Sequence, residues 1–224
     1  MNVWIVIAAY REEHSIGSVV KELVDAGYKN VVVVDDGSDD ATSRVAKKYT
    51  PHVLRHVINR GQGASLKTGI DYALENDADI IVTFDADGQH RVEDIPALIK
   101  PVKSGDADIA VGSRFLRPGS NVPFFRKLLL KGGAFLIWVL YGIKLTDSHN
   151  GFRALSRQAA EDIEITMDRM EHASEILSEI KKKNLRYVEV PVVIRYTQYS
   201  MEHGQSSWNA IKIFYRTLKH RLTK

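Results

Sequence analysis

Two stretches of the chain decide its fold: VVVVDDGS at residues 31–38 and IIVTFDADGQH at residues 80–90. Each begins with an apolar run that lacks polar alternation, which is typical of a strand buried on both faces of a parallel sheet. Each run is followed by aspartates, and ligands of open α/β sheets bind at the carboxyl ends of the strands. Four carboxylates at one edge would repel one another, so the two stretches predict a site for a divalent metal and a nucleotide.

The first 113 residues alternate strand-like and helix-like segments. Strands are expected at residues 3–9, 31–35, 53–57, 79–84 and 108–112, and helices near residues 15–26, 40–49, 63–75 and 93–102. Such repetition implies right-handed crossovers and a mostly parallel α/β sheet flanked by helices. We find no internal repeat and no low-complexity linker. We therefore expect one domain over residues 1–224, with a ligand-binding half at 1–113 and a second half at 114–224.

The composition is that of an ordinary globular protein, with 44% hydrophobic and 26% charged residues. The chain has no cysteine, which excludes disulfides, thiolate metal sites and cysteine nucleophiles. Its start runs into a strand pattern without a basic segment, so we expect no signal peptide and a cytoplasmic protein. The net charge is +3, but residues 114–144 contain six Lys or Arg and no acid, which indicates different partners for the two halves.

The basic second half contains two apolar segments. Residues 124–143 include Arg126, Lys127 and Lys131, and their longest uncharged piece is 12 residues, shorter than the roughly 20 that a membrane span needs. Residues 208–222 place apolar side chains at helical spacing with basic ones between them. Both segments are expected to form basic amphipathic helices. These either lie on the cytoplasmic face of a membrane, as a peripheral contact, or cover the sheet.

The pair Asp85-x-Asp87 is a weak signal alone, because aspartate is common at strand ends as a turn former or helix cap. Here the pair follows a buried-looking strand, and Gln89 and His90 add polar groups within reach. Carboxylate and amide oxygens suit Mg²⁺ or Mn²⁺, whose coordination is usually completed by substrate phosphates and water. Together with the aspartates of the first stretch, the pair favours a metal site.

Two further motifs bear on a nucleotide. The stretch NRGQG at residues 59–63 precedes a helix, but the position of a third fingerprint glycine is Leu66, and the P-loop pattern is also missing. Its glycines are expected to permit a tight turn and close approach of the backbone to a ligand, and Gly69 to permit close helix–sheet packing. Arg114 can pair with a pyrophosphate in forked geometry, and Arg126 is a second candidate.

These motifs resemble family 2 glycosyltransferases of the GT-A fold. The matching stretches, in the family's order, are AAYRE at 8–12, VDDGSDD at 34–40, NRGQG at 59–63, DADGQH at 85–90, GSR at 112–114 and DSHNGFR at 147–153. They look most like the branch of dolichyl-phosphate mannose synthases and polyprenyl-phosphate glycosyltransferases. The resemblance implies an inverting hexosyltransferase that uses Mg²⁺ or Mn²⁺ and a nucleotide-diphosphate sugar of the GDP-mannose or UDP-glucose type.

The resemblance implies a role for each matching residue on the donor side. The residues that hold the nucleoside base, or lie beside it, follow the first two expected strands: Ala8, Tyr10, Glu12, Asp35 and Asp36. Asp85 would face the ribose and the sugar-nucleotide. Asp87 and Gln89 would bind the metal that bridges the pyrophosphate.

The remaining matches concern the phosphates and the acceptor. Arg114 and Arg126 match arginines that neutralise donor and acceptor phosphates. Asp147, Gly151 and Arg153 match the segment that lines the sugar and acceptor site. The expected catalytic residues are therefore Asp85, Asp87, Arg114 and Asp147.

The acceptor is not decided by these residues. A polyprenyl phosphate is largely ionised near neutral pH, since the second pKa of a phosphate is about 6, and it needs no strong general base. A glycan hydroxyl would need one, and the candidates are Asp147, Glu171 and Glu175. The chain has MEHGQS at residues 201–206, where the lipid-phosphate branch often carries Arg and Lys.

Two rival classes explain less of the sequence. A sugar-phosphate nucleotidyltransferase would be expected to have a glycine-rich loop after its first strand, but residues 8–12 contain no glycine. A receiver-like signalling module would also end a strand in paired aspartates, but such modules are much shorter and leave the basic second half unexplained. No feature indicates a nucleic-acid partner or a particular oligomeric state.

Overall fold

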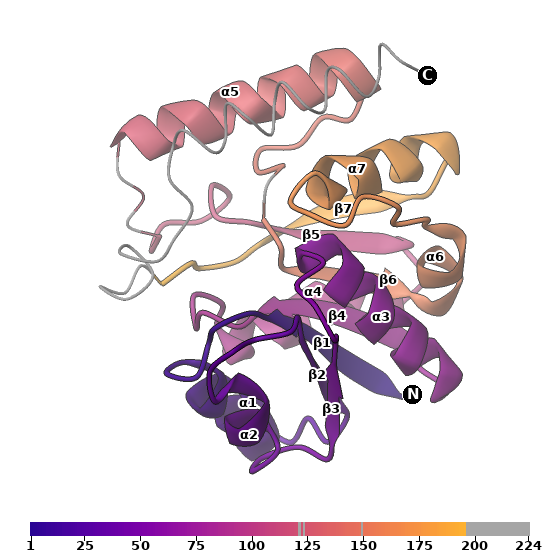
Figure 1. The fold of residues 1–224 in the computed structure, drawn as a ribbon. Coiled ribbons are helices and arrows are strands. Elements are labelled where there is room, and N and C mark those ends of the chain that lie inside the picture. The colour runs from indigo at the N-terminus through magenta and orange to yellow at the C-terminus, as the bar shows by residue number, and fades with distance from the viewer. Residues whose placement is uncertain (121, 123, 149, 196–224) are drawn as a thin grey trace.

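Seven strands form one sheet in the described part of the chain, in the order β3-β2-β1-β4-β6-β5-β7 (Figure 1). The computed structural model describes residues 1–195 except 121, 123 and 149, and leaves out the side chains of 124–126, 129 and 136. All neighbouring strands are parallel except that β6 is antiparallel to β4 and β5. The strands are β1 (Val3–Ala9), β2 (Val31–Asp35), β3 (His52–Arg55), β4 (Ile80–Asp85), β5 (Ile109–Ser113), β6 (Arg153–Ser156) and β7 (Tyr187–Pro191).

Helices cover both faces of this sheet (Figure 1). One buried cluster joins the sheet to α1 and α4, and a second joins the opposite face to α3, α6 and α7, with one residue of α5. The helices are α1 (Ile16–Asp25), α2 (Thr42–Ala46), α3 (Gln62–Glu75), a 3-10 turn η1 (Val92–Asp94), α4 (Ile95–Lys103), α5 (Phe124–Tyr141), α6 (Arg157–Asp162) and α7 (His172–Lys182). None of the described helices combines the length and the apolar character that a membrane span requires.

The α/β prediction is confirmed. All expected strands and helices of the first 113 residues are present with small differences at their ends, and the helix expected at residues 124–143 is α5. The sequence analysis did not identify β6, α6, α7 or β7. The helix expected at residues 208–222 lies outside the described residues.

The apolar run of β2 is buried on both faces, as the lack of polar alternation predicts. Val31 and Val33 belong to the cluster beneath α1, and Val32 and Val34 belong to the cluster beneath α3. Gly69 of α3 explains how closely that helix packs, because a Cβ there would overlap the Val6 side chain. The prediction of close helix–sheet packing at Gly69 is therefore confirmed.

The strand register brings the aspartates to one edge of the sheet. In this register Ala9 of β1 lies opposite Asp35 of β2, and Ala8 lies opposite Asp85 of β4. The two aspartates thus end strands on either side of β1. Because parallel strands end at the same edge, the aspartates of both stretches meet there.

Candidate active site at the carboxyl edge of the sheet

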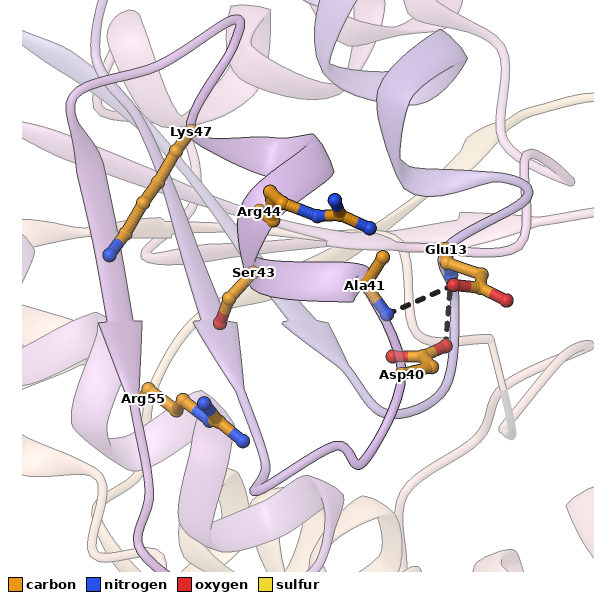
Figure 2. A pocket seen from close by; sticks show the side chains of 7 residues that line it. All are labelled: Glu13, Asp40, Ala41, Ser43, Arg44, Lys47 and Arg55. Atoms are coloured by element: carbon orange, nitrogen blue, oxygen red, sulfur yellow. Dashed lines mark hydrogen bonds between the residues drawn. The ribbon is translucent and has the colours of Figure 1, made fainter.

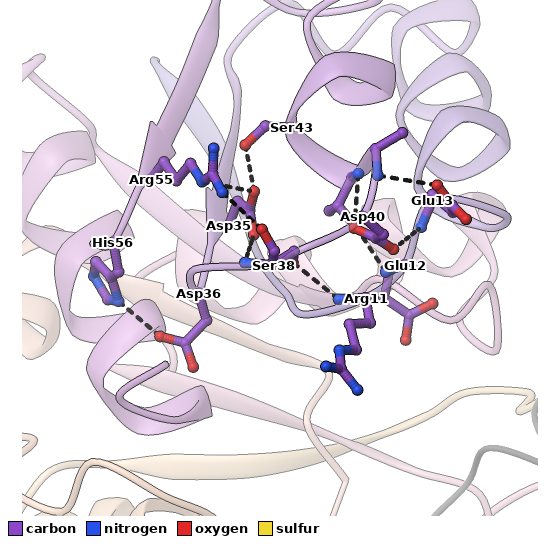
Figure 3. Close-up of polar contacts among 12 residues, drawn as sticks. Arg11, Glu12, Glu13, Asp35, Asp36, Ser38, Asp40, Ser43, Arg55 and His56 are labelled. Carbon is purple, nitrogen blue, oxygen red and sulfur yellow. Dashed lines mark hydrogen bonds and ion pairs between the residues drawn. The ribbon is translucent and has the colours of Figure 1, made fainter. Parts of the chain in front are cut away.

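Asp35 links the loop after β2 to α2 and β3 (Figure 3). It is fully buried, and its carboxylate accepts hydrogen bonds from the Ser38 N–H, at 2.9 Å, and from the Ser43 hydroxyl. Arg55 Nε lies 3.7 Å from the same carboxylate. Both oxygens are therefore already in contact with protein donors. The role of Asp35 in holding a base stays a prediction.

Asp36 shapes the loop that contains the NRGQG motif. Its carboxylate accepts hydrogen bonds from the backbone N–H groups of Arg60, at 3.0 Å, and Gly61, at 2.6 Å. His56 Nδ1 lies 2.8 Å from the same carboxylate and closes the cluster (Figure 3). Asp36 thus organises the loop before α3 directly, a structural role that the sequence analysis did not foresee.

The glycines of that motif are approached by protein backbone. Gly61 has φ +119°, in the range that favours glycine. The tight turn expected there stays a prediction. A Cβ at Gly61 would overlap the Asp168 carbonyl oxygen, and one at Gly63 would overlap the Met167 carbonyl oxygen. The Ala64 N–H donates to the Asp168 carbonyl at 3.1 Å. We expected a ligand to approach the backbone at these glycines, but residues 167–169 lie against it instead.

The loop after β1 carries Tyr10 and Glu12. Tyr10 is 41% exposed, and the Arg11 guanidinium carbon lies 5.3 Å from the centre of its ring. The Glu12 carboxylate accepts from the Ser15 hydroxyl, and the Glu12 N–H donates to Thr42 Oγ1 at 2.8 Å. In this loop Tyr10 presents an open aromatic face, while Glu12 is tied to α1 and α2.

Asp85 stands among basic groups at the end of β4. Its carboxylate lies 2.9 Å from His90 Nε2 and 3.4 Å from Gln62 Nε2. A Cβ at Gly151 would come within 2.8 Å of Asp85 Oδ1, so a larger residue there would displace this carboxylate. Burial raises the pKa of the Asp85 carboxyl, but the charges of His90 and Arg153 outweigh it and the pKa is lowered. Asp85 is therefore ionised at neutral pH.

His90 is fixed between aromatic rings. It is 3% exposed, stacks on Phe152 with ring centres 4.7 Å apart, and meets the edge of Phe84 at 5.2 Å. Its Nε2 lies 2.9 Å from Asp85 Oδ2 without the alignment of a hydrogen bond. His90 was expected to be a polar group near the aspartates, and the structure places it directly against Asp85.

Of Asp85 and Asp87, Asp87 has fewer nearby positive charges to offset its negative charge. Burial, followed by the negative charge of Asp85, raises the pKa of Asp87 to about 6, against a hydrogen bond from the Gln89 N–H. In the described part of the chain, no three His, Cys, Asp or Glu side chains form a ready-made metal site. A cation bound by Asp87 and Gln89 would offset the charge, and Mg²⁺ commonly uses one or two carboxylates plus substrate phosphates. The residues present therefore fit a metal that arrives with a diphosphate.

Arg114 and Asp147 form a buried ion pair. Asp147 Oδ2 accepts from Arg114 Nε at 2.5 Å and from the Arg114 N–H at 3.2 Å. Asp147 is fully buried and Arg114 is 8% exposed. The guanidinium is thus held in one orientation at the end of β5. The structure brings together these two predicted site residues, which are 33 positions apart in the chain.

Arg153 and His172 bring buried basic groups near Asp85. Burial lowers the pKa of Arg153 to about 10, although Asp85 and Asp147 oppose the shift. Its Nε and Nη2 atoms have no hydrogen-bond partner in the described structure. Burial, then the charge of Arg153, lowers the pKa of His172 to about 4, so this ring is neutral. His172 was not among the expected site residues, although it stands between the candidate bases Glu171 and Glu175 in the sequence.

The general-base candidates differ in their surroundings. Glu175 accepts from the N–H groups of Thr166, at 3.0 Å, and Met167, at 2.9 Å, and from the Thr166 hydroxyl at 2.5 Å. Its carboxylate is therefore used to hold the segment before α7. Asp147 is engaged by Arg114 as described above. Arg126 lies in α5, and its side chain is outside the described part of the structure.

A cavity of about 510 Å³ lies beside α2 (Figure 2). Ser43 and Arg55 line it and also contact the Asp35 carboxylate. Its other lining residues are Glu13, Asp40, Ala41, Arg44 and Lys47. The cavity mixes charges of both signs and contains none of the expected metal or phosphate residues.

Replacing Asp35 with asparagine is expected to lower the free energy of unfolding by about 1–3 kcal/mol, because an amide NH₂ would face protein donors. Thermal and urea unfolding measure this effect. Asp39→Asn is a matched control, since Asp39 lies in the same loop but pairs with Arg11 at the surface. If Asp35→Asn kept wild-type stability and lost donor affinity, the carboxylate would instead serve a ligand.

Comparisons with known proteins identify the family of this chain. The model of the family described as Glycosyl transferase family 2 matches residues 4–164. UDP-N-acetylglucosamine–dolichyl-phosphate N-acetylglucosaminyltransferase of Methanococcus voltae is 36% identical, over 99% of this chain and 97% of that protein. Dolichol-phosphate mannosyltransferase of Pyrococcus furiosus is 33% identical, over 98% of this chain and 64% of that protein.

A solved structure supports the same fold. Glucosyl-3-phosphoglycerate synthase from Mycobacterium tuberculosis, in complex with Mn²⁺ and uridine-diphosphate-glucose, superposes with a TM-score of 0.75. The match covers 98% of this chain and 78% of that chain. Because the sequence identity is only 18%, the match supports the GT-A fold and nothing further. The family match and the relatives define the activity class: the chain belongs to the family 2 glycosyltransferases and is related to dolichyl-phosphate sugar transferases.

Proposed function

We propose that this protein is a metal-dependent, inverting transferase that moves a sugar from a nucleotide-diphosphate sugar to a polyprenyl or dolichyl phosphate. The observation that carries the proposal is the arrangement of charges at the carboxyl edge of the sheet. Asp87 has a raised pKa beside ionised Asp85, and buried Arg114 follows β5. This arrangement suits a bound cation and a diphosphate. The names of the relatives point to a lipid phosphate as the acceptor.

Asp87 and Gln89 would hold the divalent metal. When bound, Mg²⁺ or Mn²⁺ supplies Lewis-acid stabilisation of the negative charge on the diphosphate. Arg114 adds a fixed positive charge that Asp147 keeps in place, and such preorganised groups often supply the largest electrostatic contribution to catalysis. Asp85 would orient the sugar-nucleotide.

The occupied carboxylates favour an acceptor that is already ionised. Glu175 holds residues 166 and 167, and Asp147 holds Arg114, so neither is poised to remove a proton. A lipid phosphate attacks the anomeric carbon without a strong base, whereas a hydroxyl requires one. The alternative is a glycan hydroxyl acceptor. Glu171, the residue before α7, was the third candidate base for that reaction.

The reaction can be tested by following both products. The enzyme is incubated with Mn²⁺, decaprenyl phosphate in detergent, and radiolabelled UDP-N-acetylglucosamine, UDP-glucose or GDP-mannose. We expect one donor to release its nucleoside diphosphate and to transfer label to the organic phase. Release of pyrophosphate would indicate a nucleotidyltransferase. A parallel incubation supplies a water-soluble oligosaccharide in place of the lipid phosphate. Label that enters only this oligosaccharide would replace the lipid phosphate with a hydroxyl acceptor.

The surface of α5 supports a peripheral contact with a membrane. Apolar side chains are exposed along this helix together with two lysines: Lys127, Leu128, Lys131, Phe135, Trp138 and Val139. Phe135 and Trp138 meet edge to face with ring centres 5.8 Å apart. Exposed aromatic and basic residues on one helix are typical of interfacial helices. The residues 114–195 would then form the acceptor side of the site.

We expect the protein to pellet with anionic liposomes at low salt, and less so at high salt. Each Lys near an anionic bilayer contributes about 1 kcal/mol, so the Lys127→Glu/Lys131→Glu variant should remain largely in the supernatant. The matched control is Lys47→Glu/Lys48→Glu, which makes the same charge change at the exposed end of α2. Equal loss of binding in both variants, or no binding of the wild type, would contradict a membrane role for α5.

A further inference from the structure

One oxygen of Glu189, on β7, accepts three hydrogen bonds from the segment that follows α5. Glu189 Oε1 accepts from the Thr146 N–H at 2.8 Å, the Thr146 hydroxyl at 2.8 Å and the Asp147 N–H at 3.1 Å. Glu189 belongs to neither the expected site residues nor the expected elements. Its side chain nevertheless fixes the backbone of Asp147, which is the partner of Arg114.

The same oxygen is also linked to the residues on either side of Arg114, through the hydroxyl groups of Thr146 and Ser113. Because the Thr146 hydroxyl donates to Glu189, its oxygen is left to accept from Ser113 Oγ, 2.6 Å away. Ser113 Oγ in turn accepts from the Phe115 N–H at 3.3 Å. Ser113 and Phe115 are the chain neighbours of Arg114. Glu189 Oε1 only accepts in these contacts, so it sets the direction of the hydrogen bond between Thr146 and Ser113.

We infer that Glu189 is a positioning residue for Arg114: through Asp147 on one side and Ser113 on the other, it holds the guanidinium where the departing diphosphate develops its charge. The inference rests on the proposed role of Arg114. Asp147 depends on this support, because its Oδ1 has no hydrogen-bond partner in the described structure. Its orientation therefore comes from Arg114 and from its own anchored backbone.

The chain offers a close control in Tyr187, two residues before Glu189 on the same strand. The Tyr187 hydroxyl accepts from the Lys144 N–H at 3.3 Å, so it holds the same segment without reaching Asp147 or Ser113. Tyr187→Phe removes that hydrogen bond and keeps the ring. A purely structural role of β7 in holding residues 144–147 predicts similar behaviour for variants at the two positions.

The test compares Glu189→Leu, Glu189→Gln and Tyr187→Phe, with nucleoside diphosphate release from UDP-N-acetylglucosamine and GDP-mannose in the presence of decaprenyl phosphate. We expect kcat of Glu189→Leu to fall about 100-fold, the size of loss that a misplacement of about 1 Å produces, with little change in donor KM. Glu189→Gln keeps an acceptor oxygen and should stay within a few-fold of the wild type. Tyr187→Phe should match the wild type. Melting temperatures confirm that each variant is folded at the assay temperature.

Arg114→Ala separates this inference from the proposed function. If Glu189 acts through Arg114, Glu189→Leu should cause little further loss in the Arg114→Ala background. A full additional loss of about 100-fold there, wild-type kcat in Glu189→Leu, or equal damage by Gln and Leu would each overturn the inference. If Arg114→Ala itself kept full activity, the assigned role of Arg114 would fail instead, along with the inference built on it.

Discussion

Asp87→Ala is expected to lower turnover by at least about 1,000-fold, because several kcal/mol of charge stabilisation at the diphosphate would be lost with the metal. The same substitution should leave the melting temperature unchanged or raise it. Asp87 has a raised pKa because its charge is buried beside Asp85, so removing the carboxylate relieves repulsion in the metal-free protein. Loss of activity with retained stability is the signature of a metal ligand, and turnover assays with thermal unfolding measure both.

A nearby carboxylate supplies the control. Glu93 is exposed and pairs with Arg91 and Arg195 at the surface, so Glu93→Ala should keep wild-type turnover. Chelation with EDTA should stop the wild-type reaction, and added Mn²⁺ should restore it. Full activity in EDTA, or in Asp87→Ala, would contradict the metal assignment.

Gly63→Ala is expected to destabilise the fold by about 3 kcal/mol, since overpacking a tight contact costs of this order. The added Cβ would overlap the Met167 carbonyl oxygen and come within 2.9 Å of His172 Cβ. Residues 167–172 would have to move away from the start of α3, where the Asp168 carbonyl accepts from Ala64. The loss of stability should appear in urea unfolding as a lower midpoint.

Gly132→Ala tests whether this effect belongs to the site and not to glycine replacement in general. A Cβ at Gly132 in α5 meets no atom within 4 Å, and alanine favours a helix by about 1 kcal/mol over glycine. We therefore expect Gly132→Ala to be neutral or stabilising. If Gly63→Ala were equally well tolerated, the close contact between α3 and residues 167–172 would not be essential to the fold.

The sequence predicts the first half of the fold because its signals are long and local. The unbroken apolar runs of β2 and β4 indicate buried strands, and the spacing of apolar residues marks the helices between them. The second half lacks such signals. β6 is four residues long and begins with the buried Arg153, and β7 places a carboxylate in mid-strand. Tertiary contacts with β4 and β5 decide both strands, and periodicity does not reveal such contacts.

The sequence predicts those site residues that lie at the ends of strands or directly after them. The aspartates, Gln89 and Arg114 all follow strands, so their common edge can be derived from the sequence alone. What the sequence does not reveal is which carboxylates already have protein partners. Asp36 holds the loop before α3, and Glu189 contacts Thr146 and Asp147 across 42 residues or more. Partnerships of that kind depend on the register of distant strands.

The position of β6 has a consequence for how the chain folds as it is synthesised. In the described sheet, β4 and β5 are not neighbours, and the strand that joins them is β6, from residues 153–156. A nascent chain that ends before β6 therefore holds the four paired strands β3-β2-β1-β4 and a separate strand β5. Their unpaired edges invite association with other chains. Cooperative folding must wait until the ribosome has released most of the polypeptide. Pairings between such distant segments slow folding, and a gene divided after residue 113 would yield two pieces that depend on each other to fold.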